Sequence, residues 1–139
     1  MWFSTLDTLK KELVFTAQKK LKLATGAGPR HLAFHPKNAG IYVLNELNNS
    51  ISLLKEKNNA YFIAKVISTL PKTFTAYSKA ADIHISKDDV FLYASNRGAA
   101  SIAIFKIHPE NGALTSIGYR AVLGYTLVIF HFLRTMSFC

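Results

Sequence analysis

Residues 26–55, GAGPRHLAFHPKNAGIYVLNELNNSISLLK, decide the fold of this chain. Three short apolar runs, HLAFH, IYVLN and ISLLK, are separated by the segments HPKNAG and ELNNS, which are rich in turn-forming residues. Short runs of β-branched and aromatic residues bounded by Gly, Pro, Asn and Ser are typical of strands joined by tight turns. We therefore predict an antiparallel meander, with Arg30, His31 and Glu46 at the ends of its strands.

The same pattern returns further along the chain. A shift of 51 residues places residues 32–55 on residues 83–106 without a gap. Identical pairs are Tyr42 with Tyr93, Asn45 with Asn96, Ser50 with Ser101, Ile51 with Ile102, and Lys55 with Lys106. A period of about 40–50 residues with about four strands per unit indicates a β-propeller blade. Two unrelated meanders with similar turns are the alternative, and the ungapped register across two turns favours the repeat.

The predicted fold is all-β: a partial β-propeller of about two four-stranded antiparallel blades with an irregular C-terminal tail. The propeller domain spans residues 1–119, with blade units at about 13–71 and 72–119, and the tail spans residues 120–139. The segment before residue 12 is consistent with a helical turn or a simple lead-in. Because a blade needs neighbours on both faces, we expect self-association through the open blade edges and weak stability of the isolated chain.

Composition limits the class of partner. The chain has 139 residues, is 50% hydrophobic and 18% charged, and carries a formal net charge of +9 from 17 Lys and Arg against 8 Asp and Glu. An excess of basic residues suits nucleic-acid binding when these residues lie in one stripe on the surface. Here the basic residues are scattered, apart from a local excess in residues 10–22. We interpret them as a solvated edge and expect no nucleic-acid partner.

The chain ends argue for a soluble protein. Cys139 is the single cysteine, so no intrachain disulfide forms and an oxidising compartment gains no support. The N-terminus has no apolar core of a signal peptide. The apolar run at residues 121–133 is shorter than the roughly 20 residues of a membrane-spanning helix. We expect a cytoplasmic protein that contacts no membrane.

Strand ends place three charged residues together. Arg30 comes just before one strand and Glu46 just after the next, so both lie at the same end of a meander. Arg97 occupies the position of Glu46 in the second unit. We call this end of the two blades, defined by Arg30, Glu46 and Arg97, the mouth. Two arginines and one carboxylate there suit an anion or a lactone.

Histidines are the remaining candidates. His35 and His84 fall within strands and are expected to be packed or hydrogen-bonded. The spacing of His31 and His35 suits a metal, but two histidines are too few ligands on their own, so we expect no metal site and no cofactor.

Three motifs carry a resemblance: GAGPRHLAFHP (26–36), YVLNELNNSI (42–51) and ADIHIS…LYASNRGAASIAIF (81–105). With them the chain resembles the seven-bladed β-propeller lactonase family, which includes propeller-type 6-phosphogluconolactonase and 3-carboxymuconate cyclase. The resemblance covers roughly residues 13–119. It implies a hydrolase that opens a phosphorylated or carboxylated sugar-acid lactone to its acid, in carbohydrate metabolism and the pentose phosphate pathway.

The resemblance also implies a site containing Arg30, Glu46 and Arg97. Our hypothesis is that Glu46 activates or orients the attacking water, while Arg30 and Arg97 bind the acid group or the developing oxyanion. His31 is a further substrate-binding candidate, with a role in holding the loop as the alternative. The alternative for the charged residues is a set of ion pairs that ties adjacent blades.

The chain departs from the family pattern in two places. No blade precedes GPRH to supply the histidine that the family takes from there, and the tail lacks the Pro-Arg-Asn-Phe opening of a further blade. A frameshift near Thr126 would account for the tail. We therefore expect a truncated lactonase chain with little activity. The alternative function is that of a non-enzymatic propeller fragment or protein-interaction module.

Overall fold

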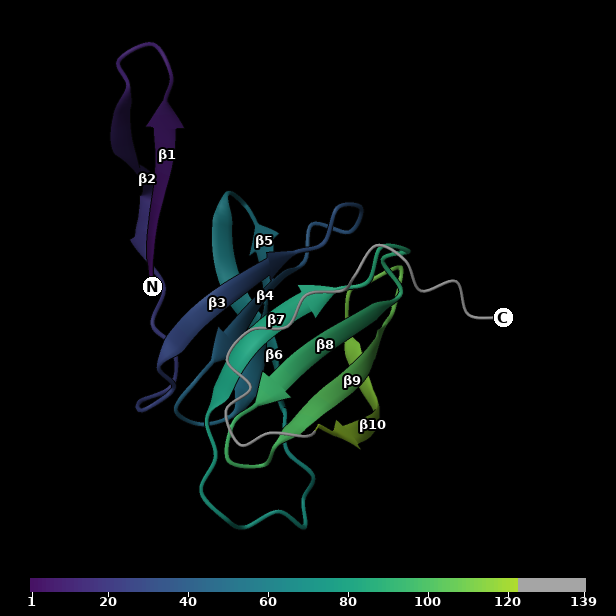
Figure 1. Cartoon of the computed structure of the whole chain (residues 1–139). Coiled ribbons are helices and arrows are strands. Elements are labelled where there is room, and N and C mark those ends of the chain that lie inside the picture. Colours follow the sequence, from purple (N-terminus) through teal and green to yellow (C-terminus); the bar gives the residue numbers. More distant parts are fainter. Residues whose placement is uncertain (123–139) are drawn as a thin grey trace.

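The computed structural model describes residues 1–122, and within them the chain forms three antiparallel sheets (Figure 1). A hairpin of β1 (Trp2–Asp7) and β2 (Glu12–Lys20) comes first. Two four-stranded sheets follow, and in each of them consecutive strands are neighbours. This confirms the prediction of an all-β partial propeller with two four-stranded blades. The predicted irregularity of residues 123–139 lies outside the described residues.

The two blades have the same construction. The first blade comprises β3 (Pro29–Phe34), β4 (Ile41–Asn45), β5 (Ser50–Lys57) and β6 (Ala60–Ser68). The second blade comprises β7 (Ala80–Ile85), β8 (Phe91–Asn96), β9 (Ser101–Ile107) and β10 (Leu114–Ala121). Their central strands share one register, because Ile41 pairs with Leu54 and, 51 residues on, Leu92 pairs with Phe105. The sequence repeat is therefore a repeat of strand pairing.

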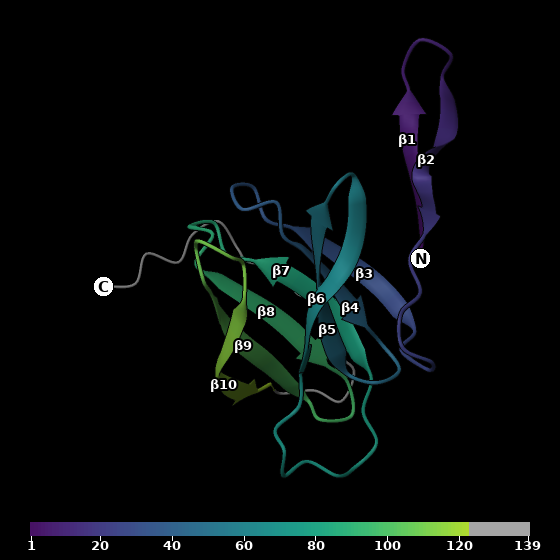
Figure 2. The ribbon, with the colours of Figure 1, turned by 180° about the vertical axis from the view of Figure 1, so that it is seen from behind.

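The blade boundaries differ from the predicted units. The first blade begins at Pro29, and residues 12–20 pair with β1 instead. Residues 8–11 form the turn of that hairpin, where Asp7 Oδ1 accepts hydrogen bonds from the backbone N–H groups of Leu9 (3.0 Å) and Lys10 (3.1 Å). At the other end β10 continues past the expected limit at residue 119, because Arg120 still pairs with Ile102. Figure 2 shows the hairpin projecting from the first blade, which it contacts through β6, because Gln18 Nε2 donates a 2.9 Å hydrogen bond to the carbonyl of Tyr61.

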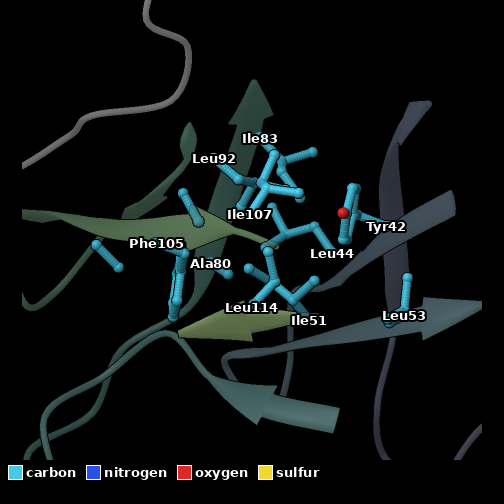
Figure 3. Close-up of a cluster of buried hydrophobic side chains, with 12 residues drawn as sticks. Tyr42, Leu44, Ile51, Leu53, Ala80, Ile83, Leu92, Phe105, Ile107 and Leu114 are labelled. Carbon is cyan, nitrogen blue, oxygen red and sulfur yellow. The ribbon is translucent and has the colours of Figure 1, made fainter. Parts of the chain in front are cut away.

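The hydrophobic core lies between the blades, and β3 and β7 lie side by side as their innermost strands (Figures 1 and 3). Alternate residues of each strand point to one face, which explains how β4 and β8 both supply residues to this layer. The core comprises Tyr42, Leu44, Ile51, Leu53, Ala80, Ile83, Leu92, Ala94, Ala103, Phe105, Ile107 and Leu114. Burial of these side chains fixes the two blades against each other, and so fixes the mouth.

Tyr42 adds a polar link to this apolar layer. Its ring is completely buried, and its hydroxyl donates a 2.8 Å hydrogen bond to the carbonyl of Gly112, in the turn between β9 and β10. Burial raises the pKa of Tyr42 to about 12, and a hydrogen bond with Asn38 acts in the opposite direction. The phenol is thus mainly neutral in the folded chain at pH values below about 12.

This raised pKa predicts a stability loss at high pH. In the unfolded chain a tyrosine ionises near pH 10, so above that pH ionisation stabilises the unfolded state alone. The contribution of Tyr42 is complete below about pH 10 and is lost as the pH rises through about 12, by roughly 2–3 kcal/mol. Urea unfolding followed between these pH values should show a shallower decline for Tyr42→Phe than for the wild type. Equal slopes would contradict the assignment.

Candidate functional site

The structure brings the three predicted charged residues together. Arg30 lies at the start of β3, Glu46 directly after β4 and Arg97 directly after β8. Arg30 Nη1 donates a 3.1 Å hydrogen bond to Glu46 Oε2, and Arg97 Nη2 donates one to Glu46 Oε1. One carboxylate therefore accepts from two guanidinium groups on adjacent blades, as the meander geometry predicted. The catalytic roles of these residues stay predictions.

Backbone contacts hold Glu46 from both sides. Its N–H donates to the carbonyl of Gly28 (2.8 Å) in the loop before β3, and its carbonyl accepts from the N–H of Ala80 (3.1 Å) at the start of β7. Gly28 has a φ of +61°, and an added Cβ would come within 2.5 Å of the Leu47 side chain. The GAGP loop thus needs a glycine at this position in order to lie against the turn that carries Glu46.

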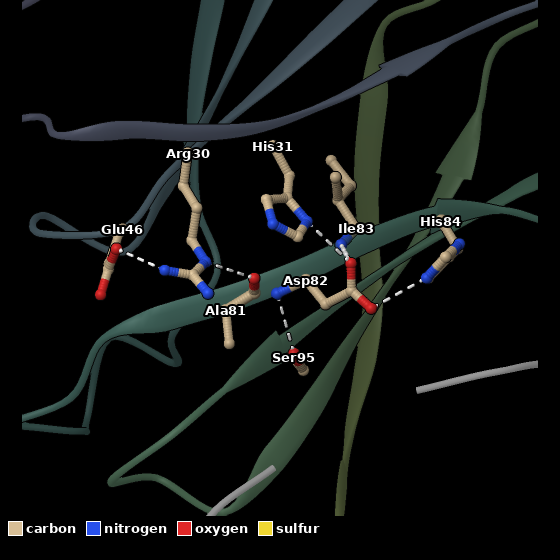
Figure 4. Close-up of polar contacts among 8 residues, drawn as sticks. All are labelled: Arg30, His31, Glu46, Ala81, Asp82, Ile83, His84 and Ser95. Carbon is tan, nitrogen blue, oxygen red and sulfur yellow. Dashed lines mark hydrogen bonds and ion pairs between the residues drawn. The ribbon is translucent and has the colours of Figure 1, made fainter. Parts of the chain in front are cut away.

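A β-bulge in β3 changes the direction in which the side chains of Arg30 and His31 point. Pro29 pairs with Asn45 and His31 pairs with Leu44, so Arg30 is an extra residue in β3. In a regular strand, successive side chains point to opposite faces, and a bulge breaks that alternation. Here both residues reach the inner strand of the second blade, as Figure 4 shows. Arg30 Nε donates to the carbonyl of Ala81 (3.0 Å), and His31 Nδ1 lies 3.0 Å from Asp82 Oδ1.

Asp82 is a site candidate that our sequence reasoning missed. Asp82 is only 3% exposed, and its Oδ1 also accepts a 3.0 Å hydrogen bond from the N–H of Ile83. Its Oδ2 lies 2.9 Å from His84 Nε2 (Figure 4). The 51-residue shift was the available signal, because it places Asp82 opposite His31 in the repeat. A buried carboxylate between two imidazoles is the second polar cluster of the site.

His35 lies directly after β3 and not within a strand as predicted, whereas His84 lies in β7, and both make the hydrogen bonds expected of them. His35 is buried, its Nδ1 accepts from the N–H groups of Lys37 (3.1 Å) and Asn38 (3.2 Å), and its Nε2 lies 3.1 Å from the carbonyl of Asp89. His84 bonds to Asp82. Within residues 1–122, no three His, Cys, Asp or Glu side chains are grouped so that they would hold a metal ion.

Opposing effects set the charge of Glu46. Partial burial raises the pKa of its carboxyl, but hydrogen bonds from Arg30 and Arg97 and their positive charges lower it more, so the pKa lies below its ordinary value. The carboxylate is therefore ionised at neutral pH and is a weak base. Two guanidinium groups against one carboxylate leave the mouth with an excess of positive charge.

An open groove adjoins the mouth. It has a volume of about 460 Å³ and lies between β3 and β7. Its lining comprises His31, Leu32, Ala33, Phe34, Asp82, Ile83, His84 and Ile85. The His31–Asp82–His84 cluster therefore borders a space that a small molecule can enter.

Sequence comparison decides the family. The pattern of the family "Lactonase, 7-bladed beta-propeller" matches residues 3–126. The chain belongs to this family. A curated relative of the lactonase family, the 6-phosphogluconolactonase of Bacillus subtilis, is 38% identical over 109 residues, which are 77% of this chain and 31% of the relative. The chain thus spans about a third of the length of the curated lactonases that it matches.

Solved structures of lactonase propellers superpose on the chain. A putative 6-phosphogluconolactonase from Bacteroides uniformis aligns with a TM-score of 0.81 at 29% identity, covering 94% of this chain and 37% of the other. The periplasmic gluconolactonase PpgL of Pseudomonas aeruginosa aligns with a TM-score of 0.78 at 25% identity, covering 86% and 34%. The two blades therefore have the arrangement of neighbouring blades in this family.

Proposed function

We propose that this chain is the part of a 6-phosphogluconolactonase-like hydrolase that carries the arginine side of its active site. The observation that supports the proposal most is the Glu46 carboxylate shared by Arg30 and Arg97 at the mouth of a lactonase-family propeller. Arginine is suited to bind carboxylate and phosphate through forked hydrogen bonds. The substrate class is a phosphorylated or carboxylated sugar-acid lactone, which the enzyme opens to its acid.

Each charged residue has a role in this proposal. Arg30 and Arg97 bind the acid group of the substrate or the oxyanion that develops at the lactone carbonyl. Arg97 Nε is buried and has no acceptor among the described residues, so it is a donor that a ligand oxygen would satisfy. Glu46 orients both guanidinium groups and, through the same carboxylate, a water. Its lowered pKa favours this orienting role over that of the base, since a strong base needs a higher pKa.

The direct test is hydrolysis of 6-phosphoglucono-δ-lactone by the full chain, measured above the spontaneous rate in buffer. The B. subtilis relative is the positive control, and unphosphorylated glucono-δ-lactone tests the need for the acid group. Turnover above buffer that depends on the phosphate supports the proposal. A rate equal to that of buffer, from a chain whose circular dichroism shows folded β-structure, overturns it for this polypeptide.

Glu46→Gln is the matching variant. It keeps the shape of the side chain but removes the charge that orients the arginines, so we expect kcat/KM to fall by about 10²-fold. Glu110→Gln, in the exposed turn before β10, is the control and should leave the rate unchanged. An unchanged rate for Glu46→Gln with retained folding would leave only the alternative, that its ion pairs tie the blades.

The second candidate function is that of a non-enzymatic interaction module. It is favoured by large apolar side chains that are exposed on the first blade, at Leu32, Phe34, Phe62 and Val66. Size-exclusion chromatography of the chain separates the two cases: a concentration-dependent oligomer without lactone hydrolysis supports the module, and hydrolysis by a monomer opposes it.

We also propose a cytoplasmic location and, because the curated relatives are named 6-phosphogluconolactonases, a place in the pentose phosphate pathway. Within residues 1–122, the structure has no helix long and apolar enough to cross a membrane. Immunoblotting of cell fractions tests the location. Recovery of the chain in a periplasmic fraction, the compartment that the name of the PpgL gluconolactonase gives, would oppose the proposal.

A further inference from the structure

We propose that His31, positioned by Asp82, accepts the proton of the attacking water in the lactonase reaction. This inference rests on the proposed function and adds to it a proton acceptor and a positioning residue. It divides the site into two parts: the charged cluster at the mouth binds the acid group, and the His31–Asp82 pair moves the proton. The following contacts carry it.

Asp82 fixes the orientation of the His31 ring. The Asp82 carboxylate lies 3.0 Å from His31 Nδ1, and its side chain is 5% exposed, whereas that of His31 is 38% exposed. A carboxylate only accepts hydrogen bonds, so the neutral imidazole carries its proton on Nδ1 and leaves Nε2 as an acceptor. The buried Asp82 carboxylate thus holds the imidazole in place, and the half-exposed His31 ring has its Nε2 available to accept a proton.

Asp82 is itself held in place. The N–H of Ile83 donates to its Oδ1 (3.0 Å), His84 Nε2 lies 2.9 Å from its Oδ2, and its own N–H donates to Ser95 Oγ (3.0 Å). These contacts come from β7 and β8, which are buried strands of the second blade. A carboxylate that is positioned on rigid elements can hold an imidazole in one tautomer and stabilise the cation that forms when it takes up a proton.

The bulge at Arg30 sets the pair next to the binding cluster. Because it breaks the alternation of β3, the side chains of Arg30 and His31 both face β7, and Figure 4 shows them side by side above that strand. His31, which follows Arg30 in the chain, and Asp82 both line the groove of about 460 Å³. A lactone whose acid group is bound by Arg30 can therefore place its ring beside His31.

The proposed step is balanced in atoms and charge. His31 Nε2 takes a proton from water as the water oxygen forms a bond to the lactone carbonyl carbon. The tetrahedral intermediate then collapses, the bond between that carbon and the ring oxygen breaks, and the ring oxygen takes the proton back from Nε2. One lactone and one water give one hydroxy acid, and the histidine returns to its neutral form.

Charged and titratable groups surround His31 on several elements. Arg30 precedes it on β3, Asp82 and His84 face it from β7, and Glu46 lies across Arg30 in the turn after β4. Glu46 is a poorer candidate for the base, because two guanidinium groups occupy its carboxylate and hold its pKa low.

The first test does not need activity. In ¹⁵N NMR spectra of the full chain at about pH 8.5, where an ordinary histidine is neutral, we expect His31 to be protonated on Nδ1. His35 is the internal control with the opposite tautomer, because its Nδ1 accepts two backbone hydrogen bonds and its Nε2–H faces the carbonyl of Asp89. A His31 protonated on Nε2 overturns the proposal, whether or not the chain hydrolyses lactones.

The second test uses lactone hydrolysis. His31→Ala should lower kcat by about 10²-fold and leave KM within a few-fold, and added imidazole should restore part of the rate. Asp82→Asn keeps an acceptor for the Ile83 N–H but loses the charge that stabilises the imidazolium, so it should lower kcat as well. His108→Gln, on the surface beside Thr115, is the matched control with unchanged activity.

The outcomes separate the two levels of the proposal. If the wild-type chain hydrolyses lactones and His31→Ala does so equally well, the proton-transfer role is wrong and the proposed function stands. A rate lost in His31→Ala and not recovered with imidazole, while folding is retained, assigns His31 to substrate binding and also overturns the role. If the wild type does not hydrolyse lactones, the proposed function fails and this inference with it.

Discussion

Phe105→Ala is expected to lower the free energy of unfolding by about 3–5 kcal/mol, because it removes a buried aromatic ring and leaves a cavity. Phe105 is completely buried in β9 and packs in the core between the two blades (Figure 3). A typical domain has only about 5–15 kcal/mol of stability, so this single change removes a large share of it. Loss of packing there also loosens the contact that keeps Arg97 near Glu46.

Urea unfolding followed by circular dichroism measures the effect of Phe105→Ala. Phe34→Ala is the matched control, since Phe34 is 65% exposed on β3, and the same truncation should cost less than about 1 kcal/mol. Equal losses for the two variants would mean that the blades do not share the core that the structure shows. A fall in the cooperativity of unfolding, without a change in midpoint, would also contradict the prediction.

Gly98→Ala is expected to destabilise the chain by about 1–3 kcal/mol and to displace Arg97. Gly98 has a φ of +52°, and an added Cβ would lie 2.9 Å from the Ser78 Cα and closer still to the Tyr77 carbonyl oxygen. These are backbone atoms of the segment before β7, so no side-chain rotation relieves the contact. The neighbouring hydrogen bond from the N–H of Arg97 to the carbonyl of Lys79 (2.8 Å) would be lost with the shift.

Gly26→Ala separates steric conflict from backbone strain. Gly26 also has a positive φ, +75°, but an added Cβ would meet nothing within 4 Å. It should therefore lose only the roughly 1 kcal/mol that a left-handed alanine costs, and it should keep the lactone hydrolysis of the wild type. Gly98→Ala should lose both stability and activity. An equal loss in the two variants would mean that the contact between the SNRG turn and the segment before β7 is unimportant.

Much of the fold follows from local sequence signals. The apolar runs, the turn residues and the 51-residue shift are sufficient to predict two four-stranded blades, and the strand ends predict that Arg30, Glu46 and Arg97 meet. The start of the first blade was predicted too early. Residues 13–20 have the composition of a strand and do belong to β2, but β2 pairs with β1 and not with a strand of the blade. Composition identifies a strand, whereas pairing also depends on the polar turn at residues 8–11.

The second polar cluster was harder to predict. Strict alternation along β3 places Arg30 and His31 on opposite faces, and only the bulge brings both toward β7. A bulge has no strong sequence signal, since here the extra residue is an arginine and not a glycine. Asp82 lay within an apolar strand pattern, and its importance depends on a contact with a residue of the other blade. Pairing between blades is information that the strand pattern alone does not contain.

Three contacts at the blade interface join residues at the same position of the repeat. Arg30 meets Ala81, His31 meets Asp82, and Glu46 meets Arg97, each pair separated by 51 residues. Two identical copies of either blade would therefore set arginine against arginine, or carboxylate against carboxylate. The carbonyl of Ala81 belongs to the backbone, so any residue there would accept from Arg30, but the other two contacts require that the units differ, with one copy supplying the imidazole or guanidinium group and the other the carboxylate. A propeller designed by repeating one blade would keep the fold and lose the site, because divergence between tandem copies is what creates it.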